Sequence, residues 1–106
     1  MKKIKIRSLR DRIGIEVPNG QDEYGNDIWL KKKDIWACVF KTNAQDKSVD
    51  DISFVESRYL IIIRKESDIQ HNMRIVHNGM RLKILVVDKE SQAHFMHIKA
   101  EECLYG

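Results

Sequence analysis

Histidine and cysteine are the residues through which this chain could ligate a metal ion. The candidates are four histidines and two cysteines: His71, His77, His94, His97, Cys38 and Cys103. A zinc site needs three or four ligands, and on a strand the three-residue spacing of His94 and His97 points them to opposite faces. No acidic pair completes a cluster, so we expect no metal and no cofactor. The cysteines are expected to be reduced thiols in a cytoplasmic setting, packed as small apolar side chains.

Paired carboxylates are the next candidates, because general acid–base catalysis often uses two of them. Asp50-Asp51 and Glu101-Glu102 are adjacent in the sequence, and strand geometry would send neighbours to opposite faces. The chain also lacks a nucleophile elbow, a Walker A loop and a dinucleotide-binding glycine pattern. We therefore expect no catalytic residue and no enzymatic activity.

Size and charge fit one small domain spanning residues 1–106. Hydrophobic residues make up 42% of the chain and charged residues 33%, a mixture typical of globular proteins. The longest apolar run, Leu60–Ile63, is too short to cross a bilayer, so we expect no membrane partner. No secretory signal is recognisable. Residues 1–11 form a basic N-terminal arm, whereas the middle of the chain is acidic, and such opposite charges can steer docking.

The dominant hydrophobic period is two, which indicates strands. The alternation predicts strands over residues 12–17, 35–40, 54–65, 73–77, 80–87 and 94–103, with Pro18 ending the first and a brief pairing at Ile28–Leu30. Antiparallel strands in this number usually close on themselves in a chain of this size. We predict an all-β, mainly antiparallel fold: a small closed or partly open β-barrel with long inter-strand loops and room for one short helical turn.

The sharpest local pattern is Asn78-Gly79 between two alternating apolar runs, which predicts a two-residue type I′ hairpin. That turn would place His77 opposite Met80, Ile75 opposite Leu82 and Met73 opposite Ile84.

Two further segments suggest contacts outside the barrel. Residues 35–40 are apolar on both faces: Trp36, Cys38 and Phe40 alternate with Ile35, Ala37 and Val39. Such a strand is expected to be covered on both sides, one of them by a neighbouring subunit. Residues 42–53 are polar and weakly periodic, which predicts a central mobile loop with a function and with room for a short helical turn.

Nucleic-acid binding is the alternative function for a small barrel. Basic grooves and aromatic platforms bind single strands without strong sequence preference, and the chain offers four aromatic candidates: Phe40, Phe54, Tyr59 and Phe95. Their spacing suits alternating core positions equally well.

The order of motifs resembles that of the tailed-phage head–tail joining proteins, also called head-closure, adaptor or stopper proteins. Residues 8–15 look like the family's opening L-R-x-R-I-x-I, and residues 22–26 resemble its D-x-Y-G turn. Residues 35–39 match its W-A-x-V strand, and residues 58–64 its R-x-x-I-x-I-R strand. Residues 73–84 are similar to its M-R-I hairpin.

This resemblance implies a structural protein of the virion neck, assembled in the bacterial host cytoplasm. Its subunits would form a homo-oligomeric ring with the portal's symmetry, below the portal or adaptor, where a tail-completion or tail protein docks. Packaged DNA would be only a neighbour in the channel. The central loop would then project into that channel, with candidates Thr42, Asn43, Gln45, Asp46, Lys47, Asp50 and Asp51. Candidates for subunit or partner interfaces are Tyr24, Trp29, Trp36, Arg7 and Arg10.

Overall fold

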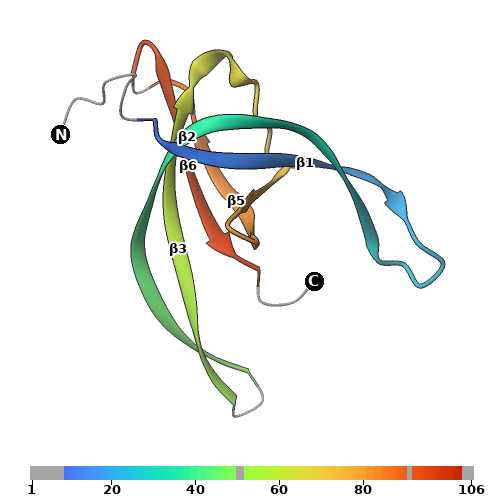
Figure 1. Ribbon diagram of the computed structural model, residues 1–106. Helices are drawn as coiled ribbons and strands as arrows, with labels where there is room; N and C mark the ends of the chain where they lie inside the picture. Colours follow the sequence, from blue (N-terminus) through green and yellow to red (C-terminus); the bar gives the residue numbers. More distant parts are fainter. Residues whose placement is uncertain (1–8, 50–51, 91, 104–106) are drawn as a thin grey trace.

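A computed structural model, shown in Figure 1, describes residues 9–49, 52–90 and 92–103. Its strands are β1 (Asp11–Gln21), β2 (Asp27–Val49), β3 (Ile52–Arg64), β4 (Arg74–His77), β5 (Met80–Asp88) and β6 (Phe95–Glu102). All neighbours are antiparallel in the order β1-β2-β3-β6-β5-β4, and β4 pairs back with β1. The sheet therefore closes on itself, and the predicted all-β barrel is confirmed.

The barrel core follows the period-two pattern. Ile13 and Ile15 of β1, Ile61 and Ile63 of β3, and Ile98 of β6 are fully buried. Each buried isoleucine contributes about 1.5–3 kcal/mol by leaving water. The alternating apolar residues of these predicted strands therefore face the barrel interior.

The hairpin at Asn78-Gly79 is also confirmed. Both turn residues have positive φ, 50° and 78°, as a type I′ turn requires. His77 pairs with Met80 and Ile75 with Leu82. Met73 differs from the prediction, because β4 begins at the next residue and the ladder ends there.

Two hairpin arms project from the barrel, because β1, β2 and β3 are longer than the barrel wall (Figure 1). The β1–β2 arm, residues 17–30, lies beyond the last β1–β4 pair and is held only by pairing between β1 and β2. Pro18 was expected to end its strand, but β1 continues to Gln21 with Pro18 opposite Trp29. Proline is tolerated here because this edge of β1 no longer has a partner strand that needs its N–H.

The β2–β3 arm, residues 42–57, corrects the prediction of a central loop. Backbone pairing continues from Asn43 opposite Arg58 to Val49 opposite Ile52, so residues 42–53 are mostly strand. The arm lies beyond the barrel, so neither face of its strands packs on the core and apolar residues need not alternate with polar ones. The weak periodicity of these residues was therefore wrongly interpreted as a loop. The short turn is a 3₁₀ helix, Lys65–Ser67, that follows β3 instead.

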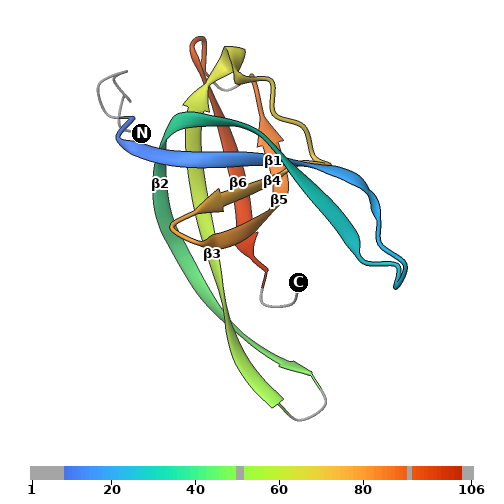
Figure 2. The same ribbon diagram turned by 45° about the vertical axis from the view of Figure 1, so that its right-hand side comes forward.

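Each arm leaves the barrel at a β-bulge in β2. Ile15 pairs with Lys33 but Glu16 with Lys31, which leaves Lys32 as an extra residue. Thr42 is the corresponding extra residue at the root of the second arm. Bulges bend a strand and increase its twist, and Figure 2 shows the two arms pointing in different directions from the barrel.

Candidate functional site

The tip of the β1–β2 arm is a rigid turn organised by Asp22. Its Oδ1 accepts hydrogen bonds from the backbone N–H groups of Tyr24 and Asn26, both at 2.9 Å. Hydrogen bonding with the backbone of Asn26, the largest cause, keeps the pKa of Asp22 below its ordinary value. Gly25 supplies the positive φ of 82° that the turn needs. The tip is therefore preformed within the single chain.

The surface of this tip is acidic and carries an aromatic side chain. Tyr24 is 81% exposed, and Ile28 and Leu30 are also exposed behind it. Asp22, Glu23 and Asp27 give the segment 21–30 three negative charges and no positive one. An exposed tyrosine among like charges suits docking against a basic apolar surface.

A three-residue brace holds the root of the β1–β2 arm. Arg74 of β4 forms a 2.5 Å ion pair through its Nε with Glu16 of β1. The same guanidinium lies 4.3 Å from the ring centroid of Trp29 in β2. Trp29, a predicted interface residue, is half-buried and stacked against Arg74 of the same chain, which suggests that it positions the arm.

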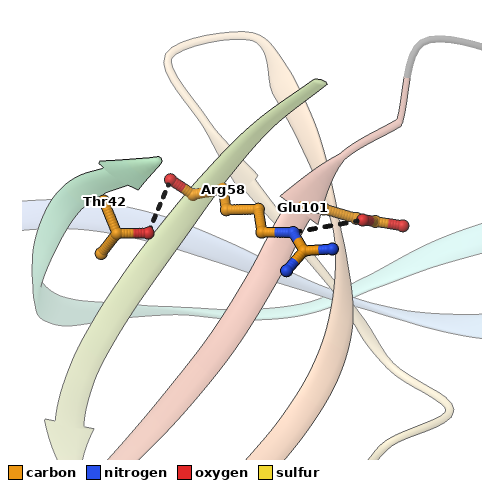
Figure 3. A network of polar contacts seen from close by, with 3 residues as sticks. All are labelled: Thr42, Arg58 and Glu101. Atoms are coloured by element: carbon orange, nitrogen blue, oxygen red, sulfur yellow. Dashed lines mark hydrogen bonds and ion pairs between the residues drawn. The ribbon is translucent and has the colours of Figure 1, made fainter. Parts of the chain in front are cut away.

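A second polar network lies at the root of the β2–β3 arm (Figure 3). The hydroxyl of Thr42, the bulged residue, donates a hydrogen bond of 3.3 Å to the carbonyl oxygen of Arg58. The Nε of Arg58 lies 4.0 Å from a carboxylate oxygen of Glu101 in β6. Of the predicted channel residues, Thr42 is thus at the base of the arm. Asp50 and Asp51 lie outside the described residues, as do the side chains of the other four: Asn43, Gln45, Asp46 and Lys47.

A groove lined by arginines lies at the start of β1. Its walls come from the segment before β1, from β1 and β2, from the last residue of β3 and from the 3₁₀ helix after it: Leu9, Arg10, Arg12, Asp34, Ile35, Trp36, Arg64 and Ser67. Trp36 is 55% exposed, with the guanidinium of Arg12 4.9 Å from its ring centroid. The one acid, Asp34, pairs with Lys31 at 2.7 Å. The groove therefore presents three arginines around an exposed tryptophan.

This groove brings together two of the predicted interface residues, Arg10 and Trp36, and leaves Tyr24 at the tip of the β1–β2 arm. Arg7 lies outside the described residues. Sequence reasoning missed Arg12 as the partner of Trp36 and Arg64 as a residue that lines the same groove. The pairing of Arg12 with Trp36 follows from the β1–β2 register, which the sequence alone did not specify.

The outer face of β2 is partly covered by the chain itself. Leu9, Ile62 and Phe95 form a second apolar cluster, and Cys38 and Leu60 pack against it. Burial raises the pKa of the Cys38 thiol, which fits the expected packing role. Trp36 and Phe40, at 55% and 44% exposed, are large apolar residues of this face that stay accessible to solvent.

The described part of the chain offers little support for metal binding or for nucleic-acid binding through an aromatic platform. There, no three histidine, cysteine or acidic side chains gather as metal ligands. Two members of the aromatic platform considered for nucleic acid, Tyr59 and Phe95, are buried, and the side chain of Phe54 lies outside the described residues. Among the residues that can be described, no helix is long and apolar enough to cross a membrane.

Comparison with known structures identifies similar folds. A chain from the virion of a native gene transfer agent particle matches with a TM-score of 0.72 and 17% identity, over 92% of this chain and 97% of that one. Protein SF1141 from Shigella flexneri 2a matches with a TM-score of 0.64 and 22% identity, over 97% and 100%. The xkdH protein of the phage-like element PBSX from Bacillus subtilis matches with a TM-score of 0.53 and 14% identity, over 87% and 92%.

No curated protein matches the sequence. The family model described as phage head completion protein, however, matches residues 4–103. That range includes the closed barrel, both arms and the arginine groove. The chain therefore belongs to the phage head completion proteins, a family of phage structural proteins.

Proposed function

We propose that this protein forms a ring in the neck of a phage or prophage particle, below the portal, where it closes the DNA-filled head and offers the docking surface for the tail. The observation that carries the proposal is the match to the head completion family over residues 4–103. The solved virion that contains a chain of similar fold supports a place in the particle. A role through assembly needs no catalytic residue.

The β2–β3 arm is the part best suited to reach into the channel of such a ring. It projects well away from the barrel (Figure 1), and the contacts among Thr42, Arg58 and Glu101 lie at its root. Four acidic residues in the arm, Asp46, Asp50, Asp51 and Glu56, stand against Lys47. A constriction made from several copies would be negative, and would repel the DNA phosphates as well as obstruct them.

Removing the arm without disturbing the barrel tests this role. Because Ala44 pairs with Ser57, residues 45–56 can be replaced by Asn-Gly, which closes the hairpin in register. We expect the shortened protein to unfold at a temperature close to that of the wild type and to enter particles, while heads lose their packaged DNA. Heads that carry the shortened protein and still retain DNA would show that the arm does not close the channel.

A matched variant separates length from charge. Asp46→Asn, Asp50→Asn and Asp51→Asn together keep the arm at full length and remove three of its four negative charges. DNA retention in this variant indicates obstruction by the arm itself, and DNA loss indicates that repulsion contributes most. Failure of the wild-type protein to co-purify with heads or portal would contradict the neck assignment as a whole.

A further inference from the structure

The two most distinctive surfaces of the molecule lie at opposite ends of β1. The arginine groove, defined above around Trp36, surrounds the start of this strand, and the acidic tip at Tyr24 follows its end. In Figures 1 and 2 the beginning of β1 and the tip of its arm lie on opposite sides of the barrel. Ten strand steps at 3.3 Å separate the ends of β1 by about 33 Å, so one subunit's tip cannot reach its own groove.

Building on the proposed ring, we infer that the β1–β2 arm tip of each subunit docks in the arginine groove of the next copy of this chain. Two different complementary patches on opposite sides of a subunit are what a head-to-tail contact requires, and such contacts close into rings when the rotation permits. The occupant of the groove is thus the arm tip of a second copy of this chain, and this contact joins each subunit to the next one around the ring.

Charge complementarity supports this pairing. The tip carries Asp22, Glu23 and Asp27 without a basic residue between positions 21 and 30. The groove offers Arg10, Arg12 and Arg64. Its single acid, Asp34, is already compensated by Lys31. Matching a negative protrusion to a positive recess favours this orientation over tip-to-tip or groove-to-groove contact, each of which places like charges together.

Side-chain types support it as well. Tyr24, at 81% exposed, and Trp36, at 55% exposed, are both large aromatic side chains left in solvent. Tyrosine, tryptophan and arginine are the residues that most often dominate binding energy at interfaces. The turn around Asp22 is preformed, so docking of the tip would order little new backbone and lose little entropy.

Cysteine cross-linking in assembled particles tests the contact. Tyr24→Cys and Ser67→Cys each place one thiol, at the tip and in the groove, and neither substitution touches the barrel core. In particles treated with a short bis-maleimide, the double variant should give a ladder of covalent multimers. The two single variants, which keep the same native cysteines, should not. Particles that contain the double variant but yield no ladder would overturn the inference.

A charge exchange provides an independent test. Glu23→Arg should reduce incorporation of the protein into particles at least tenfold, and Arg10→Glu with Arg64→Glu should do the same. The combination of all three should restore incorporation, because the complementary charges are exchanged. Glu90→Lys, an exposed acid in the turn after β5, is the control and should have no effect. Asp22 is left intact because it builds the turn.

Failure of the inference can be told from failure of the proposed function. If wild-type protein closes heads but neither cross-linking nor charge exchange behaves as expected, the ring uses another contact and only the inference falls. If wild-type protein is absent from heads, the neck role itself falls. Loss of duplex DNA binding in the Arg10→Glu, Arg64→Glu variant, measured by gel shift, together with normal incorporation, would assign the groove to DNA and overturn the inference.

Discussion

Replacing Arg74 with methionine removes the brace at the root of the β1–β2 arm while retaining most of the side-chain volume. The ion pair to Glu16 is short, 2.5 Å, and the two side chains are only 12% and 22% exposed, so solvent screens it weakly. A hydrogen bond between charged groups contributes about 1.5–3 kcal/mol. Stacking of the guanidinium on half-exposed Trp29 adds about 0.5–1 kcal/mol.

The expected loss is therefore about 2–4 kcal/mol, a large share of the roughly 5–15 kcal/mol that stabilises a domain of this size. Urea unfolding of Arg74→Met, Glu16→Gln and the double variant would measure it. The double-mutant cycle should give a coupling free energy of at least about 1 kcal/mol between Glu16 and Arg74. Arg81→Met, at an exposed position of β5, should change stability by less than about 0.5 kcal/mol.

The location of the damage is the second part of this prediction. In Arg74→Met, amide hydrogen exchange should accelerate in the β1–β2 arm more than in the β2–β3 arm, because only the first loses its brace. A coupling free energy below about 0.5 kcal/mol, or equal acceleration in both arms, would refute the claim that this cluster fixes the arm.

Two further predictions concern the turns. Gly79→Ala should destabilise the barrel by about 1–2 kcal/mol in urea unfolding, because φ is 78° there. Gly14→Ala, whose added Cβ would lie 3.4 Å from Asp34 Oδ1, should cost less than about 0.5 kcal/mol; equal costs would contradict the type I′ geometry. The pKa of Asp22 is lower in the folded protein than in the unfolded chain, where it lies near 3.8. Asp22 therefore stabilises the turn fully at pH values above the unfolded pKa. This stabilisation is lost as the pH falls through the lower, folded pKa. In an NMR titration the Tyr24 and Asn26 amide signals should therefore shift below pH 3.8, and a midpoint at or above that value would count against the hydrogen-bonded turn.

Local patterns allowed most of the barrel to be predicted from the sequence. Asn78-Gly79 predicted the hairpin turn correctly because the geometry of a type I′ turn depends on only two adjacent residues. The alternation in residues 58–64 predicted which face of that strand is buried. The same signal failed for residues 42–53. Alternation of apolar and polar residues indicates that one face of a strand is buried. Backbone pairing between β2 and β3 continues beyond the barrel wall, where neither face packs on the core.

The candidate site was harder to predict because it depends on long-range register. Trp36 and Tyr24 stood out as exposed aromatic candidates, but their surroundings come from other strands. Arg74 and Glu16 meet across 58 positions of sequence, and Arg12 meets Trp36 only because β1 and β2 pair in one particular register. A bulge at Lys32 shifts that register by one residue, and no sequence motif predicts this bulge.

The length of β2 has a mechanical consequence. This one strand runs from Asp27 to Val49 through the first arm, the barrel wall and the second arm, and it contains neither glycine nor proline. β-Bulges at Lys32 and Thr42 bend the strand where each arm leaves the barrel, but backbone pairing continues through all three parts. A protein that pulls on the β1–β2 arm therefore pulls on the same continuous strand that forms part of the barrel wall and one side of the β2–β3 arm.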